Sequence, residues 1–504
     1  MKKKLQKILI IIFILLYEIS SLQAQSFYYE TITKNDAQKY LEKLYTSMQA
    51  LHPNLYEYIS KGDYDKAYSE LMHNLDTVEY YNSGRLYLAF QEFVALCRDG
   101  HSSVGLFRKI EPNKKRNDEI PIRKNPNTLT FPFIFNIVNG KMYVNYNCLE
   151  DNAIPIKSEI VSIGNQTIKE WLQEKRASKS NERDEYKDAY ISRVSGYKRL
   201  NSDSCKYGYV LYGAQDTLYK TLYSMRINPY KETECWSNFY SYSDVDYNEG
   251  DQLTFRIVDG GRIGIICMGR FDPPQIMLPL INRALDSLKF CGAEDLIIDL
   301  RESPGGHAES GYALIDRITN KPYRTDFEEQ VFIKHSMLTS SNKYMRKIWQ
   351  HRDYIRKKDV KPIMKVGRDT VIVHQFSEIQ PKDYKNKFAG RIWVLTSAFT
   401  FSAATGFAAI VQDCLLGTVV GEETGGVPNC YGNPMDYMLT GVLDEKLIRF
   451  EYFAPYIKCI RPSGDDSMKL RGVIPDIEIE PNIILSEDIQ LQTLIEIIRT
   501  QAKK

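Results

Sequence analysis

The chain has 504 residues, with 66 Lys and Arg against 64 Asp and Glu and a formal net charge of +2. This balance excludes a nucleic-acid binder that works by bulk positive charge and a mainly acidic, solvating chain. With 43% hydrophobic and 26% charged residues, the composition is that of a globular protein rather than a disordered one. The length predicts about three structural units.

The first segment has the three-part layout of a secretory signal peptide. Basic residues 2–7 (KKKLQK) precede an apolar run at 8–17 (ILIIIFILLY), and the small residue Ala24 is placed for cleavage. The run is short for a membrane anchor, although an uncleaved anchor stays open as an alternative. We therefore expect a signal peptide at 1–24 and a periplasmic or secreted protein, with no stable membrane span after cleavage.

The chain has nine cysteines. If the protein is exported, they can form disulfides, because the compartment is oxidising. Nine is an odd number, so at least one cysteine lies outside an internal pair. Cys267 lies in an apolar strand-like run (IGIICM) and Cys414 ends a helix-like run, so both are interpreted as buried small hydrophobes rather than bridges. No CxxC occurs, so neither a redox motif nor a zinc ribbon is indicated. We expect no metal and no organic cofactor.

The pattern along the mature chain divides it into three regions. Residues 25–105 carry apolar side chains at helical spacing and predict about three helices, ending at Asp99-Gly100. Residues 106–260 contain alternating stretches that predict strands, with turns at Asn139-Gly140 and Gly164-Asn165. Within them, the charged stretch 173–206 is expected to be exposed.

From residue 261 to 504 the pattern alternates between strands and helices, which predicts a layered α/β core. The strands are expected at 263–268, 295–300, 391–397 and 417–422, and helices at 276–288 and 401–413. A polar and basic insertion at 320–390 is expected to be a surface lid rather than core.

Three short stretches of this sequence carry residues suited to catalysis. In Asp299-Leu300-Arg301-Glu302-Ser303-Pro304-Gly305-Gly306, paired glycines follow a buried strand, so backbone N–H groups can approach an anion. In VLTSAFTFSAATGFAAI, Ser402 lies between a strand and a helix, where its hydroxyl can project outward. In CRDGHSSV, His101 has the side chain that most often serves as a general base.

Each stretch also has a purely structural interpretation. The glycines can form a plain strand-to-helix turn, and Ser402, Thr400 or Ser397 can cap the helix. His101 can be a turn histidine bonded to backbone. Among the other histidines, His307 directly follows the glycine pair and is the main rival for the base.

Taken in order, DGHSSV, IGIICMGRF, DLIIDLRESPGG, VLTSAFTFSAA, GEETGG and GVIPDIEI make the sequence resemble the tail-specific (C-terminal processing) serine proteases. The Asp-Gly-His motif is similar to that of their tricorn-core-like branch. The resemblance implies a crotonase-like β/α spiral core at 261–504, an N-terminal helical bundle, and a degenerate PDZ-like module at about 130–175. It implies Ser402 as the nucleophile, with oxyanion donors from Ala403 and from Gly305 or Gly306.

One departure from the family bears on the mechanism. Many members activate serine with a lysine, whose place is taken here by Val427, and no Lys or Arg occurs from Ser402 to Glu445. A serine nucleophile needs an adjacent base, which the histidine branch supplies, here as His101. That branch also uses a glutamate where this chain has Lys469. The substitutes left open are Asp465, Asp466, Glu451, Glu422 and Glu423.

The sequence therefore predicts an exported serine endopeptidase that cleaves peptides or unfolded proteins through an acyl-enzyme. Two other classes stay open. One is a catalytically inactive protein on the same scaffold that binds peptides or an apolar ligand. The other is an acyl-CoA enzyme, against which the signal peptide argues. The substrate, the oligomeric state and the disulfide pairing are left undetermined.

Overall fold

The computed structural model describes most of the chain after the predicted signal peptide. The described residues are 31–108, 129–148, 153–193, 199–200, 202–226, 253–333, 363–366, 369–432, 435–438, 448–484 and 487–501. The predicted signal peptide at 1–24 lies outside them, as does 334–362 within the predicted insertion. In the parts of the chain described here, no helix combines the length and apolarity that crossing a bilayer requires.

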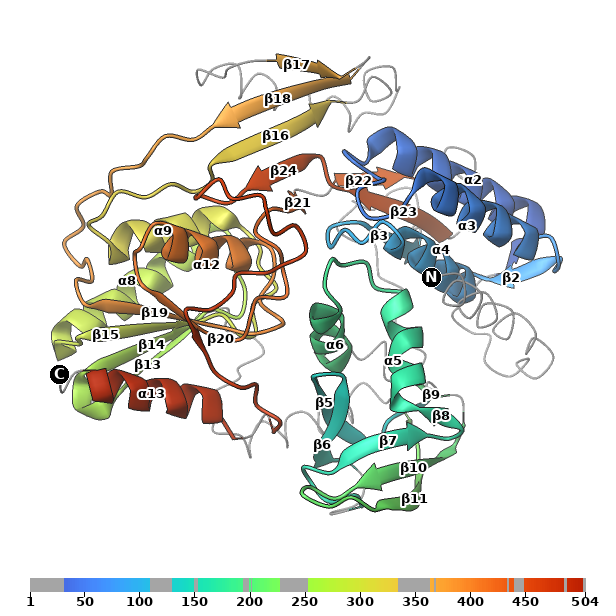
Figure 1. Cartoon of the computed structure of the whole chain (residues 1–504), viewed down its shortest axis with the longest axis horizontal. Helices are drawn as coiled ribbons and strands as arrows, with labels where there is room; N and C mark the ends of the chain where they lie inside the picture. The colour runs from blue at the N-terminus through green and yellow to red at the C-terminus, as the bar shows by residue number, and fades with distance from the viewer. Residues whose placement is uncertain are drawn as a thin grey trace.

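A six-stranded sheet lies at the centre of the C-terminal half, in the order β13-β14-β15-β19-β20-β25 (Figure 1). Strands β14 to β25 pair in parallel, and β13 pairs antiparallel with β14. Leu296 and Ile298 pack toward helices α8, α9 and α12, whereas Ile297 packs toward α13, because successive side chains of a strand face opposite sides. Both faces are covered, as a parallel sheet requires, and the predicted layered α/β architecture is confirmed. The elements are β13 (Thr254–Val258), a 3-10 turn (Asp259–Gly261), β14 (Ile263–Cys267), α8 (Pro274–Cys291), β15 (Asp295–Asp299), α9 (Ala308–Ile318), β19 (Arg391–Thr396), α12 (Ala403–Asp413), β20 (Thr418–Gly421), β25 (Ile477–Glu478) and α13 (Ile489–Gln501).

Three N-terminal helices pack against a small sheet of strands from both ends of the chain, β22-β23-β3 (Figure 1). The rings of Tyr40 and Phe90 meet Phe450 of β23 edge-on, at centroid distances of 4.9 and 5.2 Å. Thr33, Ser60 and Asn82 cap the three helices through their side chains. This packing joins the N-terminal helices to the C-terminal half. The elements are β1 (Thr31–Thr33), α2 (Lys34–Leu51), α3 (Lys61–Asn74), β2 (Tyr80–Asn82), α4 (Ser83–Ala95), β3 (Ser103–Arg108), β22 (Met435–Met438) and β23 (Ile448–Ala454).

The second region contains a sheet in the order β11-β10-β7-β6-β5 with two helices, α5 and α6. Asn139 and Gly140 both have positive φ, 52° and 74°, and close the β5–β6 hairpin, which confirms the turn predicted there. The elements are β4 (Leu129–Thr130), β5 (Phe133–Val138), β6 (Lys141–Asn147), β7 (Glu159–Ile163), β8 (Gln166–Thr167), α5 (Ile168–Ala177), α6 (Asp184–Arg193), β9 (Arg199–Leu200), β10 (Ser204–Val210), β11 (Thr217–Tyr223) and β12 (Met225–Arg226).

The expected exposure of 173–206 is wrong for the segment around α6. Tyr186 and Ala189 are buried against Phe399 and Phe401, which precede α12. Four charged residues of this segment are buried, namely Glu182, Arg183, Lys187 and Asp188, and Asp188 is paired with Arg176. Paired charges can be buried, so the density of charge here does not indicate a solvent-facing segment. The segment instead packs beside the end of β19.

The described part of the predicted insertion is not a lid lying on the surface. It contributes β16, β17 and β18 to a five-stranded sheet in the order β17-β18-β16-β24-β21 (Figure 1). Val331 and Ile372 of this sheet are buried in the same core as the N-terminal helices. The elements are β16 (Glu328–Ile333), β17 (Ile363–Val366), β18 (Asp369–Gln375), β21 (Tyr431–Gly432) and β24 (Ile457–Ile460).

The prediction for Cys267 and Cys414 is confirmed for the absence of a bridge but only in part for burial. Cys267 and Cys414 are free thiols that are partly buried, whereas Cys148 is disulfide-bonded.

Candidate active site

Ser402 and His101 meet at hydrogen-bonding distance although they lie 301 positions apart, with 3.0 Å between Ser402 Oγ and His101 Nε2. His101 lies in the turn between α4 and β3. Ser402 follows β19 and immediately precedes α12. The docking of the N-terminal helices on the C-terminal half therefore brings the two side chains together. His307, the rival histidine, lies exposed at the start of α9.

The backbone at Ser402 is in a conformation that residues other than glycine seldom adopt, with φ 51° and ψ −124°. Its side chain makes no capping hydrogen bond to α12, so capping does not explain the serine. Two neighbours hold the turn on the end of β15: Ser397 Oγ donates to the Arg301 carbonyl at 2.6 Å, and Thr400 Oγ1 to the Leu300 carbonyl at 2.9 Å. A strained residue fixed on all sides is typical of a functional position.

The predicted glycine loop packs directly against the Ser402 turn. Gly305 and Gly306 have φ of 93° and 137°. A Cβ on Gly305 would lie 2.8 Å from both Ala403 N and Ser402 Cβ, so only glycine fits there. The Phe271 N–H donates to the Gly305 carbonyl at 3.0 Å, which holds the loop.

Backbone donors remain available at this contact. Among the residues that the structure describes, the N–H groups of Gly305, Gly306 and Ala403 donate no hydrogen bond. Ala403 is the first residue of α12, and a helix N-terminus favours negative charge. The arrangement can therefore receive an oxyanion beside the Ser402 hydroxyl.

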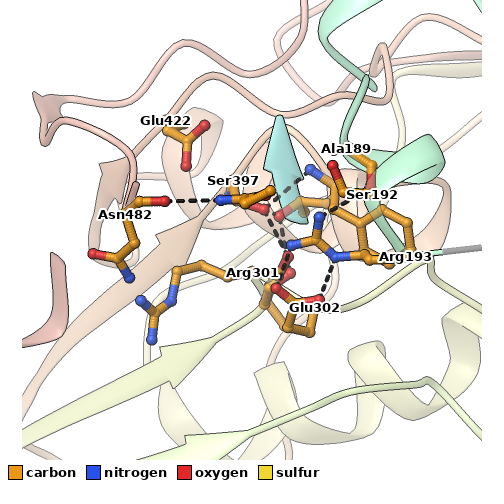
Figure 2. A network of polar contacts seen from close by, with 12 residues as sticks. Ala189, Ser192, Arg193, Arg301, Glu302, Ser397, Glu422 and Asn482 are labelled. Carbon is orange, nitrogen blue, oxygen red and sulfur yellow. Dashed lines mark hydrogen bonds and ion pairs between the residues drawn. The ribbon is translucent and has the colours of Figure 1, made fainter. Parts of the chain in front are cut away.

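A polar network fixes the residues just before the glycines (Figure 2). Arg193 of α6 donates to both carboxylate oxygens of Glu302 and to the Ala189 carbonyl. Arg301 bridges the carboxylates of Asp299 and Asp488 and is 9% exposed. Because such bidentate pairs restrict both partners, the loop between β15 and α9 is anchored from two sides.

The His101 ring lies against Phe401 at a centroid distance of 4.9 Å and an interplanar angle of 29°. Burial lowers the pKa of His101, the negative charge of Asp99 raises it, and Lys179 lowers it further, with a net lowering below the usual 6.5. His101 is therefore neutral at neutral pH. A neutral imidazole is the form that can accept a proton from Ser402.

The far side of the ring lacks the expected carboxylate. Nδ1 of His101 is buried and makes no hydrogen bond of good geometry to any described residue, although the Tyr431 carbonyl lies close enough to raise the pKa of the ring. No hydrogen bond joins His101 to the five carboxylates left open by the sequence, among the residues described. Three of the five have other partners: Glu422 accepts a hydrogen bond from Gln490, Glu423 binds Arg471 and the Gly472 N–H, and Asp466 binds Lys458. Asp465 is exposed. Glu451 is buried in β23, where it pairs with Gly105 of β3.

Lys469 occupies the position where the family's glutamate is expected, and its ammonium pairs with Glu57. Its Nζ lies 3.1 Å from Oε1 of Glu57, and the Tyr431 hydroxyl donates to Oε2 of the same carboxylate at 2.6 Å. The lysine is thus paired with a residue of the α2–α3 connection. It ties that connection to Tyr431, which begins β21.

Several polar residues around the His101 turn were missed by the sequence analysis. The Gly100 N–H donates to Glu182 Oε1 at 3.3 Å, and burial together with the charge of Asp99 raises the pKa of Glu182 to about 7. Burial lowers the pKa of Lys179 to about 8, and its ammonium lies 4.3 Å from the Tyr190 ring centroid. Asp99 and His52 form a buried pair beside them, with 3.2 Å between His52 Nε2 and Asp99 Oδ2. Only Asp99 carried a signal in the sequence, through the Asp-Gly-His motif.

Metal binding has no evident place at this site. Within the described ranges, no group of three or more His, Cys, Asp or Glu side chains is arranged to hold a metal ion.

Solved structures of similar fold cover nearly the whole chain. The structure of mature CPAF complexed with lactacystin is 13% identical and covers 93% of this chain and 97% of that one, with a TM-score of 0.58. A second structure of mature CPAF is also 13% identical and covers 92% and 96%, again with a TM-score of 0.58. The photosystem II D1 C-terminal processing protease is 14% identical and covers 88% and 93%, with a TM-score of 0.40. At these identities the two CPAF structures bear on the fold alone.

No curated protein matches the sequence. The model of Peptidase family S41 matches residues 262–479, the segment that contains the glycine loop, Ser402 and most of the six-stranded sheet. This segment is therefore assigned to peptidase family S41, the tail-specific proteases, and the protein is a serine-type peptidase.

Proposed function

We propose that the protein is an exported serine endopeptidase in which Ser402 is the nucleophile and His101 the general base. The observation that carries the proposal is the 3.0 Å contact between Ser402 Oγ and His101 Nε2. Ser402 lies in a strained turn beside free backbone N–H donors, and its hydroxyl contacts an imidazole. This is the geometry of an activated serine.

In the proposed reaction, Ser402 Oγ attacks the carbonyl carbon of a peptide bond while His101 Nε2 takes the hydroxyl proton. The negative charge that develops on the carbonyl oxygen is stabilised by the N–H groups of Ala403 and of Gly305 or Gly306. The protonated His101 then gives its proton to the leaving amine, which departs and leaves an acyl-enzyme on Ser402. Water, deprotonated by His101, hydrolyses the ester and restores the serine. The substrates proposed are peptides or unfolded proteins.

The division of the chain is proposed together with this function. Helices α2, α3 and α4 support an N-terminal helical bundle over 25–105, and the sheet and helix between β5 and α5 support a PDZ-like module at about 130–175 within 106–260. The parallel strands with helices on both faces support a crotonase-like β/α spiral core over 261–504. Secretion to the periplasm or beyond, after cleavage at Ala24, rests on the sequence of residues 1–24.

The test is a Ser402→Ala variant, assayed for cleavage of an unstructured protein and for covalent labelling by a fluorophosphonate probe. We expect cleavage and labelling to fall to background, with a thermal midpoint close to that of the parent, because one partly exposed hydroxyl is removed. Ser287→Ala is the control, since that hydroxyl on α8 donates to the Arg283 carbonyl of its own helix. Cleavage by Ser402→Ala at the parental rate would show that the nucleophile is another residue. A parent that neither cleaves nor labels would show an inactive scaffold.

A further inference from the structure

The carboxylate nearest to His101 binds the main chain of the histidine rather than its ring. Asp99 is 1% exposed, and its Oδ1 accepts the His101 N–H at 3.0 Å. Its Oδ2 accepts the Ser102 hydroxyl at 2.6 Å, and its carbonyl accepts the Ser180 hydroxyl at 2.6 Å. The residue before it, Arg98, has a positive φ of 55°. Asp99 therefore fixes a tight turn whose next side chain is the proposed base.

The second partner of Asp99 Oδ2 is His52, which ends α2 and is 2% exposed. His52 Nδ1 accepts the Asn54 N–H at 3.2 Å, so in the neutral ring the proton resides on Nε2 and points at Asp99. Burial alone would lower the pKa of His52, but its contacts with Asp99 and Cys97 raise it to about 9. Protonation would cost the Asn54 hydrogen bond, yet Nε2–H faces Asp99 in either state.

We propose that His52 is a positioning residue for the reaction, which acts through Asp99 to hold the His101 turn and to balance the carboxylate charge beside the proposed base. The inference rests on the proposed roles of Ser402 and His101. It assigns to a residue of the N-terminal helices the support that serine peptidases commonly obtain from a carboxylate on the histidine ring.

The first argument is that a buried carboxylate needs full compensation. An ionised group removed from water without partners costs several kcal/mol, and here the compensation comes from one imidazole, one hydroxyl and one backbone amide. His52 is the ionisable member of these three. Without its donor, Asp99 retains a charge that is balanced only by neutral groups.

The second argument concerns the charge that His101 experiences. Asp99 raises the pKa of His101, while Lys179 lowers it. Glu182 faces the turn through Gly100, and Tyr58 and Cys430 also lie close enough to interact with Asp99. Since His52 offsets the charge of Asp99, its loss should raise the pKa of His101, and loss of the Asp99 charge should lower it.

The experiment follows the His101 imidazole by NMR in the full chain with labelled histidine, in four variants: His52→Leu, His52→Gln, Asp99→Asn and the exposed His73→Leu as control. His52→Leu should move the titration of His101 upward by about one pH unit. Asp99→Asn should move it downward. His52→Gln, which can present an N–H at the position of Nε2, should stay near the parent, as should His73→Leu. A role in packing alone would not move the two titrations in opposite directions.

Kinetics on a peptide substrate provide the second readout. His52→Leu should lower kcat by about tenfold to a hundredfold with KM little changed, the size expected from a displaced catalytic group, and His52→Gln should restore most of it. An unchanged His101 titration in Asp99→Asn, or equal losses in His52→Leu and His52→Gln, would overturn the proposal. If His52→Leu does not fold, His52→Ala takes its place, with the same expected upward shift of the His101 titration, and a titration that stays at the parental value overturns the proposal. The titrations need no activity, so they separate a failure here from a failure of the proposed peptidase function.

Discussion

The two turns that meet at the site are held by different forces. The Ser402 turn is held by backbone, by the uncharged hydroxyls of Ser397 and Thr400 and by close contact with glycine, in the space between β15, β19 and α12. The His101 turn is held by buried polar side chains from two other segments, namely His52 after α2, and Ser180 and Glu182 between α5 and α6. The difference implies that steric changes should damage the first turn, whereas charge and pH should act mainly on the second.

The largest effect is expected from Gly305→Ala, which places a methyl group against the sterically held Ser402 turn. The new methyl group would meet Phe401 O at 2.7 Å and Ala403 N at 2.8 Å, in a backbone with φ 93°. We expect kcat/KM to fall by about a hundredfold to a thousandfold, as when one oxyanion donor is lost. Gly62→Ala at the start of α3, where a Cβ has room, is the control and should retain parental kcat/KM. Parental activity in Gly305→Ala would show that the glycine loop does not serve the reaction.

An intermediate effect is expected from Phe401→Leu, which changes the ring that the two turns share. Phe401 stacks on His101 and, at 4.6 Å, on Tyr186 of α6. Aromatic pairs contribute roughly 0.5–1.5 kcal/mol beyond burial, so we expect kcat to fall about threefold to tenfold. Phe399→Leu should lose a similar amount of stability, since that ring stacks on Tyr186 at 5.9 Å, but should retain kcat. Equal kcat values in the two variants would show that the stacking on His101 is irrelevant to turnover.

The third effect concerns stability rather than turnover and sharpens the electrostatic side. The pKa of Glu182 is raised from 4.5 to about 7, so the folded protein binds more protons than the unfolded chain between these values, and stability falls as the pH rises through that window. Glu182→Gln should match the parent near pH 4 and exceed it at pH 8 by about 1–3 kcal/mol. Urea unfolding at the two pH values measures the difference. The exposed Glu185→Gln should show the parental pH dependence, and an identical pH dependence in Glu182→Gln would contradict the assignment.

Much of the architecture could be predicted from apolar patterning. Buried strands such as 295–299 are nearly continuous apolar runs, and the helices beside them repeat apolar residues at helical spacing. The prediction that Ser402 and His101 meet depended on the order of the motifs along the chain, because no periodicity relates residues 301 positions apart.

The rest could not be predicted, because a sequence does not show which polar residues become buried. The segment around Glu182 and Lys187 has the charge of a solvated surface, yet both residues are under 10% exposed. His52 directly follows α2. The apolar spacing that predicts this helix gives no indication that the histidine is buried against Asp99. The family's glutamate has no equivalent on the His101 ring among the described residues, and Lys469 instead binds Glu57.

The separation of His101 from Ser402 along the chain also has a consequence for biogenesis. A polypeptide that leaves the ribosome, or an export channel, from its N-terminus delivers the imidazole long before the hydroxyl. On the proposed mechanism, neither half can hydrolyse anything until the first helices have docked on the last strands to emerge. On that mechanism, the active centre is complete only after nearly the whole chain has been made.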